Sequence, residues 1–471
     1  MKKKVAILAN GCNYEILYRF EESLYKNSST FKIDYFNFLW NATQAFNNHT
    51  DSKGMIFRLP DLKQFDAIVI FNPGLNLAEQ IDYVYNAASE AHIPVISIGM
   101  EYPGFSYIGI DNYSGMKELC NHLLDEHNVK SLHVIAGSMD NDDSNTRVRA
   151  VWDALSEHGI GINPNHVFYS DWLTNAAAGY IDRLFENNEQ IPDAFICAND
   201  YLAEMVTYVL STHGINVPDD CIVTGFDYNE EGRIFFPSIA TIDQRYDLIG
   251  QTTARLLIDT FNGEPVDSST RIECIYIPGD SCGCHNQRNA EQLRQEYGHS
   301  LLLKRRNIIA IDSVTSNLQK AIIESINYEE LKENLKKAFS ESSGYEGSNF
   351  FIMMDPKLDK ISETEIADTP GYSFADRMDV VAGKRNGISV NADSISIRDL
   401  IPEYNDEDDN HTYYFIPIYF DTYACGYAVF CDKNEWVLEK NFVAFEDVLT
   451  RNFELYRNRI QINHFRNKKD S

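Results

Sequence analysis

Asn199 and Asp200 stand where a short apolar run at 195–198 gives way to a helical pattern. An amide and a carboxylate at such a point are compatible with four roles: a helix cap, a catalytic acid, a metal ligand, or recognition of a bound small molecule. Asn both donates and accepts hydrogen bonds, whereas an ionised Asp only accepts them. The residue types alone leave these four roles open.

A second candidate for chemistry is the segment SCGCHN at 281–286, because Cys282, Cys284 and His285 carry ligand atoms that soft metals prefer. A Cys-x-Cys-His run lacks the second ligand pair that zinc fingers place at a fixed spacing. Cys274 is the nearest other thiol in the sequence. We therefore predict no metal site and interpret the segment as a thiol-bearing junction.

Other patterns that could support catalysis are incomplete or missing. The acidic run at 140–143 is similar to a calcium loop, but it lacks the Gly at the sixth place and the Glu at the twelfth. His122, His127 and His133 fall near one predicted helix, with no nucleophile or carboxylate partner defined by a motif. The sequence contains no Gly-x-Ser-x-Gly elbow, P-loop or dinucleotide fingerprint. We predict a non-enzymatic protein without a cofactor.

The balance of charge argues against nucleic acid as a direct partner. The chain has 70 acidic residues against 41 Lys and Arg, a formal net charge of -29, whereas contacts to phosphate dominate the affinity of proteins for nucleic acid. Basic runs occur at 2–4, 304–306 and 466–469, none with interleaved aromatic residues. We predict no direct binding to DNA or RNA.

The N-terminal residues and the number of cysteines predict the cellular compartment of the protein. The opening MKKKVAILANG has about five apolar residues before Asn10, fewer than the roughly 7–15 of a signal sequence, and no run approaches the roughly 20 apolar residues of a membrane span. Nine cysteines, an odd number, are scattered along the chain, which fits reduced thiols. We predict a cytoplasmic protein without a membrane segment.

The first 284 residues alternate strand and helix. Near-continuous apolar strands, such as those at 5–10 and 131–137, are separated by amphipathic helices, a pattern typical of parallel sheets covered on both faces. Two such runs predict two doubly wound α/β lobes. Ligands of such sheets lie beyond the carboxyl ends of the strands, and Asn199 lies at such an end.

The pattern changes after residue 284. A helical segment at 286–327 precedes shorter strands, and the last four of these, with NG and DTYACG turns, predict an antiparallel sheet. A second amphipathic helix at roughly 438–466 ends the chain. At 471 residues, two to four domains are expected.

Several motifs together resemble one known family. The stretches IGIDNYSGMKELCNHLLDEHNVKSLHVIAG, SNTRVRAVWDAL, PDAFICANDYLAEMV, GINVPDDCIVTGFD and PSIATIDQRYDLIGQTTARLLID resemble the ligand-binding core of the lactose/galactose-repressor (LacI/GalR) family, over about residues 4 to 280. That core has the type I periplasmic binding protein fold. The resemblance implies a ligand-sensing domain at 1–284, with lobes joined by crossovers near 128–131, 244–246 and 272–280.

The resemblance also implies a polar ligand, a sugar or a related metabolite, held in a cleft between the lobes. Asp111 and Asp227 would accept hydrogen bonds from hydroxyl groups, Arg147 would hold a hydroxyl or carboxylate, and Trp172 would stack on a ring. The full set of implied ligand contacts is Cys12, Asn13, Tyr14, Asp111, Arg147, Trp172, Asn199, Asp227 and Gln244.

Structural roles compete with these implied contacts. Arg147 is close enough in sequence to pair with Asp142 or Asp143, and Trp172 could fill a core. Asp111 and Asp227 could be turn or cap residues. For the pair at 199–200, we expect Asp200 to cap the helix and Asn199 to face the ligand.

The chain also departs from the family pattern. Family repressors begin with a helix-turn-helix, whereas here the first strand of the core begins at Val5. Tyr228 stands where many members have a second Asp, and Ala150 where Gly is usual, which leaves the identity of the ligand in doubt. The start of the core at Val5, together with the acidic net charge, leads us to expect a sensor rather than a DNA-binding repressor.

The second half resembles a GAF-type sensor domain. The resemblance rests on HTYYFIPIYFDTYACGYAVF and implies an α+β domain at 328–445, flanked by signalling helices at 285–327 and 446–471. Similar arrangements precede diguanylate cyclase domains in bacterial signalling proteins, although no GGDEF-type motif is present in this sequence.

The resulting hypothesis is a homodimeric, non-catalytic sensor in which closure of the lobes on the ligand moves the helix and the GAF-like domain. Two alternatives stay open. One is the regulatory part of a diguanylate cyclase cut before its output domain, and the other is a transcriptional regulator of the LacI/GalR type.

Overall fold

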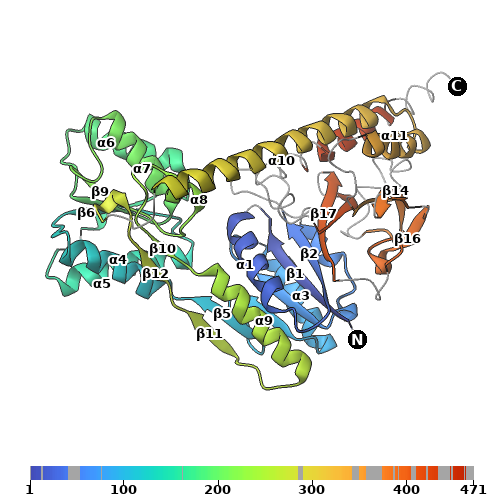
Figure 1. Cartoon of the computed structure of the whole chain (residues 1–471), viewed down its shortest axis with the longest axis horizontal. Helices are drawn as coiled ribbons and strands as arrows, with labels where there is room; N and C mark the ends of the chain where they lie inside the picture. The colour runs from blue at the N-terminus through green and yellow to red at the C-terminus, as the bar shows by residue number, and fades with distance from the viewer. Residues whose placement is uncertain are drawn as a thin grey trace. The chain divides into compact units, whose positions relative to one another are not determined.

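The structure is a computed structural model of the whole chain, shown in Figure 1. It describes residues 2–11, 14–40, 54–75, 77–161, 163–284, 290–341, 349–356, 374–385, 388–390, 392–404, 410–420, 423–432, 446, 449–460 and 462. These residues fall into two compact units. Unit 1 is drawn from 1–108, 247–269 and 302–471, and unit 2 from 109–246 and 270–301.

Unit 1 contains a parallel sheet built from the first strands of the sequence. Its strands are ordered β11-β5-β4-β3-β1-β2 at this end of the sheet. Their bounds are β1 (Lys3–Asn10), β2 (Ile33–Trp40), β3 (Ala67–Phe71), β4 (Val95–Ile98), β5 (Ser106–Ile110) and β11 (Ser269–Ile272). Every residue of β2 and β3 is buried, as expected where both faces of a sheet are covered.

Helices and short turns connect these strands. Their bounds are α1 (Tyr14–Asn27), η2 (Met55–Arg58), η3 (Leu62–Gln64), α3 (Ala78–Ala91) and α9 (Tyr246–Asn262). In α1 the apolar residues Leu17, Phe20 and Leu24 are buried, because their spacing places them on one face of the helix. The predicted alternation of strand and helix is confirmed here.

The C-terminal strands extend this same sheet. They are β13 (Asn349–Met354), β14 (Arg377–Arg385), β15 (Ile388–Ser389), β16 (Ser394–Ser396), β17 (Thr412–Phe420) and β18 (Tyr423–Cys431). The pairs β17–β18, β13–β18 and β13–β14 are antiparallel, which confirms the predicted antiparallel arrangement. β17 runs parallel to β2 and lies beside it (Figure 1), so that Tyr413 is opposite Phe36.

This continuity changes the expected division of the chain. The sequence predicts a domain at 328–445 apart from the first 284 residues, whereas the described strands of that segment belong to a sheet of twelve described strands that begins in the N-terminal lobe. The physical reason is that β2 would otherwise be an edge strand with unpaired backbone groups. The GAF-like identity of the segment stays a prediction.

Polar and aromatic contacts hold the two parts of unit 1 together. The Tyr414 hydroxyl donates to Glu21 Oε2 at 2.6 Å, and the Tyr404 hydroxyl donates to Asp34 Oδ2 at 2.6 Å. The rings of Phe38 and Phe415 stack with centroids 4.7 Å apart. One hydrophobic core therefore includes residues from both ends of the chain.

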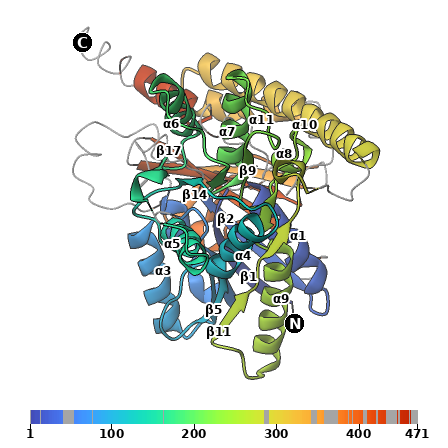
Figure 2. The ribbon, with the colours of Figure 1, turned by 90° about the vertical axis from the view of Figure 1, so that its left-hand side faces the viewer.

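Unit 2 is a smaller α/β layer structure. A parallel sheet, ordered β7-β6-β8-β9, has α6 and α7 on one side and α4 and α5 on the other, as Figures 1 and 2 show. Its strands are β6 (Leu132–Ala136), β7 (Val167–Tyr169), β8 (Ala194–Cys197) and β9 (Ile222–Thr224), with a separate antiparallel pair, β10 (Thr241–Asp243) and β12 (Ile275–Ile277). Its helices are α4 (Asn112–Asp125), α5 (Asp142–Glu157), η4 (Pro164–His166), α6 (Thr174–Glu186), α7 (Asp200–Thr212), α8 (Glu230–Ile234) and η5 (Asp280–Cys282).

The first crossover differs from the expected one. We expected it near 128–131, whereas the chain leaves unit 1 after Ile108, before α4. The apolar face of α4 packs on α5 and on the core of unit 2, and an amphipathic helix does not reveal in its sequence which lobe it covers. The chain later passes between the units after Tyr246 and after Ser269, where crossovers near 244–246 and 272–280 were expected.

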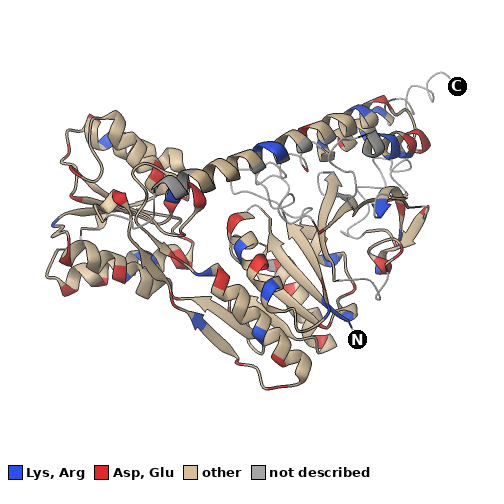
Figure 3. Cartoon of the chain, in the orientation of Figure 1, with Lys and Arg blue, Asp and Glu red and all other residues tan. Residues whose placement is uncertain are grey.

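A long helix, α10 (Ala290–Glu324), starts in unit 2 and ends in unit 1, and α11 (Tyr328–Glu341) follows it. Residues 449–460 are also helical. In Figure 3 acidic residues are spread over both units, while α10 carries the basic run at 304–306. Among the described residues, no helix combines the length and hydropathy needed to cross a membrane.

Candidate ligand site

Polar side chains gather at the carboxyl edge of the unit 2 sheet. β6, β8 and β9 end there, and the chain turns directly into α5, α7 and α8. In parallel sheets this edge is where ligands bind. The residues that follow these strands therefore form the candidate site of unit 2.

Arg147, on α5, is the centre of this cluster. Its side chain is 7% exposed. Nε and Nη2 donate to Asn112 Oδ1 at 3.2 and 2.9 Å, and Nη1 donates to the Ala198 carbonyl at 2.5 Å. The guanidinium also lies over the ring of Phe226, 3.7 Å from its centroid, a favourable cation–π arrangement. Arg147 thus joins α5 to α4 and to the end of β8.

Asp227 and Gln244 continue the cluster on the other side of Arg147. Asp227 Oδ1 lies 3.9 Å from Arg147 Nη1 and accepts a hydrogen bond from Gln244 Nε2. Gln244 Oε1 in turn accepts from the Tyr246 hydroxyl at 3.1 Å. The side chain of Asp227 is 26% exposed, so this carboxylate is the more accessible member of its ion pair.

At the pair 199–200 the helix cap is Asn199, whereas we expected Asp200 to cap the helix. Asn199 is the N-cap of α7, because its Oδ1 accepts from the Leu202 backbone N–H at 2.9 Å. Asp200, which we expected to cap the helix, is instead buried. An N-cap satisfies a backbone donor that would otherwise have no partner. Asn199 still has an amide N–H₂ group at this edge, so its contact with a ligand stays a prediction.

Asp200 fixes the loop after β9. The residue is 1% exposed. Its carboxylate accepts a hydrogen bond from the Thr241 hydroxyl at 2.6 Å and another from the Asn229 backbone N–H at 2.8 Å. Burial, and then the charge of Asp227, raise the pKa of Asp200 well above its ordinary value. A Cβ at Gly225 would lie 2.1 Å from Asp200 Oδ1, so only glycine fits there.

Trp172 lies at the end of β7, the outer strand. Asp171 and Trp172 both have positive φ, 51° and 64°, which is unusual for residues other than glycine. This backbone carries the indole across Gly137, where an added Cβ would be 2.2 Å from Trp172 Cζ2. The ring is partly buried against the α6–α7 core, so the structural interpretation of Trp172 holds, and stacking on a ligand stays a prediction.

Asp111 caps α4, and the next residue, Asn112, contacts Arg147, which the sequence did not predict. Asp111 Oδ1 accepts from the Ser114 backbone N–H at 3.0 Å. Asn112 Nδ2 donates to Asp143 Oδ1 at 2.8 Å, while its Oδ1 accepts from Arg147. Asp143 therefore reaches Arg147 through Asn112, and one residue of the acidic run at 140–143 takes part in this network.

The structure brings together only part of the expected set. One network includes three of the expected residues, Arg147, Asp227 and Gln244. It also includes four residues that the sequence did not indicate: Asn112, Asp143, Phe226 and Tyr246. Tyr14 is the first residue of α1 in unit 1. Cys12 and Asn13 lie outside the described residues. The only signal for Asn112 was its place beside Asp111 at a strand end.

The comparisons with known proteins match this part of the chain. Residues 121–282 match the family described as periplasmic binding protein-like domain. This part of the chain is therefore similar to a periplasmic binding protein-like domain. It is also similar to the ligand-binding core of the lactose/galactose-repressor family, as the sequence motifs indicated.

Curated relatives of the chain are regulators of transcription. The HTH-type transcriptional repressor PurR of Aliivibrio salmonicida is 23% identical over 44% of this chain and 62% of its own length. The HTH-type transcriptional regulator CelR of Thermobifida fusca is 26% identical over 38% of this chain and 53% of its own length. The chain thus spans little more than half the length of these relatives.

A solved structure shares the fold. The dimeric lac repressor, bound to operator and the anti-inducer ONPF, has a TM-score of 0.50 with 14% identity, over 60% of this chain and 94% of that one. At this identity the likeness shows the fold alone, which supports the predicted α/β periplasmic-binding-protein-like class.

Proposed function

We propose that the chain is the sensing part of a transcriptional regulator and that a small polar molecule binds at the carboxyl edge of the unit 2 sheet. The observation that carries this proposal is the network of Arg147 with Asn112, Ala198 and Asp227. The names of the relatives, PurR and CelR, favour a regulator of transcription over the sensor that acts through a GAF-like domain.

The chemistry of this edge suits a ligand with several hydroxyl groups. Asp227 accepts hydrogen bonds from hydroxyls, and the amides of Asn112, Asn199 and Gln244 both donate and accept. The indole of Trp172 supplies an apolar surface at the same edge. Convergent polar groups beside one aromatic platform are typical of sites for sugars and related metabolites.

The buried network explains how the site stays ordered before the ligand arrives. Arg147 uses its donors on α4 and on the end of β8, so the two elements keep a fixed separation at this edge. A preorganised site loses less conformational entropy on binding. Arg147 is therefore proposed to position the site, and Asp227 to contact the ligand.

A thermal-shift screen of sugars, nucleosides and amino acids tests the proposal. We expect one of these classes to raise the melting temperature of the wild-type chain. Asp227→Asn removes a charged acceptor, which is expected to weaken binding by about 10- to 100-fold. Asp219→Asn is the matched control, because Asp219 is an exposed carboxylate of unit 2 outside the candidate site.

The outcome that overturns the site is specific. If a compound stabilises wild type and Asp227→Asn equally, it binds elsewhere. If no compound of the three classes shifts the melting temperature, the ligand class is wrong.

A second candidate function keeps the C-terminal segment in the mechanism. α10 begins in unit 2 and ends in unit 1, and the predicted GAF-like strands share a sheet with β2. We infer a non-catalytic relay in which ligand binding changes the position of α10, in a homodimer and with an output module such as a diguanylate cyclase further along. A ligand shifts such an equilibrium only by its difference in affinity for the two states.

Direct DNA binding by this chain is tested separately. A gel-shift assay at low salt, with and without the ligand, should show ligand-dependent binding if this chain itself contacts an operator. If no shift occurs in either condition, direct binding to an operator is excluded for this chain, and both the sensing part of a regulator and the relay are still compatible with the result. The net charge of -29 predicts no shift.

A further inference from the structure

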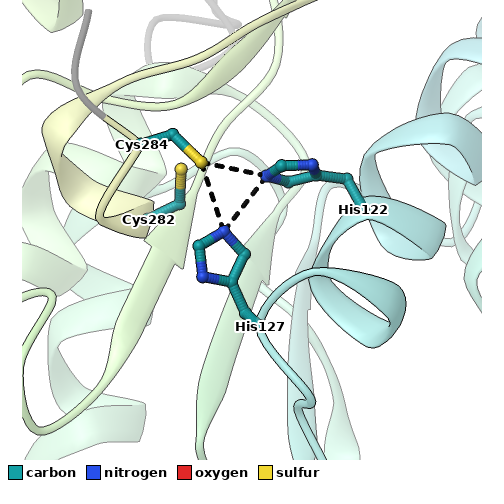
Figure 4. Close-up of side chains that lie close together, drawn as sticks. All are labelled: His122, His127, Cys282 and Cys284. Carbon is teal, nitrogen blue, oxygen red and sulfur yellow. Dashed lines mark hydrogen bonds between the residues drawn. The ribbon is translucent and has the colours of Figure 1, made fainter.

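Four soft ligand atoms converge in unit 2, away from the polar edge described above. They belong to His122, His127, Cys282 and Cys284, and all lie within 4.8 Å of one another. Cys284 Sγ is 3.3 Å from Nε2 of each histidine, and the two Nε2 atoms are 3.1 Å apart. Figure 4 shows both imidazoles pointing at the sulfur of Cys284, with Cys282 beside it.

Two separate parts of the chain supply these side chains. His122 lies in the last turn of α4, and His127 follows the end of that helix. Cys282 ends the short helix η5, and Gly283, with φ 83°, turns the chain so that Cys284 faces the same point. The positive φ makes glycine the suitable residue at 283.

The second ligand pair that the sequence motif lacked is thus present in space. The sequence hypothesis grouped Cys282 and Cys284 with His285, and on that basis predicted no metal. His285 lies outside the described residues. The histidine pair comes from α4 and the residues after it, about 160 positions earlier in the chain.

The donor set and the spacing fit zinc. Structural zinc sites are tetrahedral, with Cys₂His₂ as one of the common sets, Zn–S of about 2.3 Å and Zn–N of about 2.0–2.1 Å. Such bonds place neighbouring ligand atoms roughly 3.3–3.8 Å apart. The separations of 3.1 and 3.3 Å here require only small adjustments of the side chains.

The surroundings suit a closed, structural site. Cys282 is 1% exposed, and its Sγ lies 3.2 Å from the Tyr276 hydroxyl, a neighbour of the kind that orients metal ligands. Two thiolates and two neutral imidazoles would cancel the charge of a divalent ion, which lowers the cost of burying it.

We propose that His122, His127, Cys282 and Cys284 bind one Zn²⁺ ion that fixes the segment before α10 to the end of α4. Binding converts the two thiols to thiolates, releases their two protons to solvent and leaves the metal's oxidation state unchanged. The ion joins residues 282–284 to the end of α4 within unit 2, the unit that contains the candidate ligand site. This proposal does not depend on the proposed function.

Metal analysis of the full chain tests the proposal. The protein is purified under reducing conditions without an affinity tag, and its metals are measured by mass spectrometry. We expect about one zinc per chain. After removal of zinc by a chelator, one equivalent of Co²⁺ should give visible bands of tetrahedral geometry and a thiolate-to-cobalt charge-transfer band.

Variants locate the ion. Cys284→Ser and His127→Gln should lose the bound zinc, whereas Cys221→Ser and His158→Gln, which alter a thiol and an imidazole of unit 2 outside the cluster, should keep it. His127→Cys supplies a different zinc ligand at the same place. It should retain the ion and strengthen the charge-transfer band, which distinguishes ligand loss from misfolding.

Three results would overturn the proposal. The first is a wild-type chain with far less than one zinc that also fails to take up Co²⁺. The second is zinc retained at the wild-type level in both Cys284→Ser and His127→Gln. The third is a disulfide between Cys282 and Cys284 in the protein purified under reducing conditions.

Discussion

At the scale of single residues, close packing explains why two positions of the candidate site accept only glycine. The indole of Trp172 lies against Gly137, and the carboxylate of Asp200 lies against Gly225, with no room for a Cβ at either glycine. Both glycines directly follow strands of the unit 2 sheet. The shape of the site therefore depends on the absence of side chains as well as on the polar groups.

Gly137→Ala is expected to destabilise the protein by about 1–3 kcal/mol, because the added methyl forces the indole or the backbone to move. Denaturant unfolding measures the change. In the background of Trp172→Ala the same substitution should cost less, and the difference is the coupling energy of the pair.

Gly179→Ala in α6 is the control for this prediction, since the nearest atom to its added Cβ is Arg183 Nη1 at 3.9 Å. Alanine is the better helix former, so we expect no loss of stability there. Equal costs for Gly137→Ala with and without the indole would contradict the packing described for Trp172.

At the scale of elements, a buried acid connects α1 to β17. Glu21 is fully buried on α1 and accepts from the Tyr414 hydroxyl on β17. Burial raises the pKa of Glu21 from 4.5 to about 8, and the hydrogen bond from Tyr414 lowers it by less. Glu21 is thus protonated in the folded protein near neutral pH.

The raised pKa of Glu21 predicts a loss of stability as the pH rises. Below about 4.5 the carboxyl is protonated in both states. Between about 4.5 and 8 the unfolded state loses its proton while the folded state retains it, so the free energy of unfolding falls. The loss is on the order of 3–5 kcal/mol at most.

Glu21→Gln removes this titration, since glutamine is neutral at every pH. The variant should therefore be more stable than wild type at pH 8 and similar to it near pH 5, as measured by denaturant unfolding at several pH values. Glu22→Gln, on the exposed side of the same helix, should follow the wild-type profile. If the free energy of unfolding of Glu21→Gln depends on pH in the same way as that of wild type, Glu21 is not the titrating group.

The elements also show what the sequence can predict. The strands and helices of the first 284 residues were predicted because apolar runs and periodic stripes are local patterns. Arg147, Asp227 and Gln244 were proposed only through the resemblance to the LacI/GalR core, because no local pattern marks them as ligand contacts. The pairing of β17 with β2 and the meeting of His122 with Cys284 were not predicted, because each joins segments that are distant in the sequence and that no local pattern connects. Asn112 was missed because one polar residue at a helix start looks the same whether it caps, binds Arg147 or faces solvent.

At the scale of the molecule, the main feature is that unit 1 is built from both ends of the chain. The parallel strands of the N-terminal half and the antiparallel strands of the C-terminal half share one sheet and one core. Phe36 and Phe38 on β2 pack against Tyr413 and Phe415 on β17. The C-terminal segment is therefore expected to be necessary for the stability of the N-terminal lobe.

A chain ending at residue 341 tests that expectation. It lacks β13 to β18 and leaves β2 as an apolar edge strand, which is a common cause of aggregation. We expect this shorter chain to aggregate, or to melt at a lower temperature than the full chain, in light-scattering and thermal-unfolding measurements. A soluble product with an unchanged melting temperature and oligomeric state would show that the shared sheet contributes little to stability.

The most direct measurement is whether the ligand binds at the carboxyl edge of the unit 2 sheet. Hydrogen–deuterium exchange is measured for the full chain with and without the compound that gives the largest thermal shift. We expect slower exchange in the segments after β6, β8 and β9, at 137–141, 198–202 and 225–229. Slower exchange confined to the opposite edge of that sheet, at 188–193 and 216–221, would contradict it.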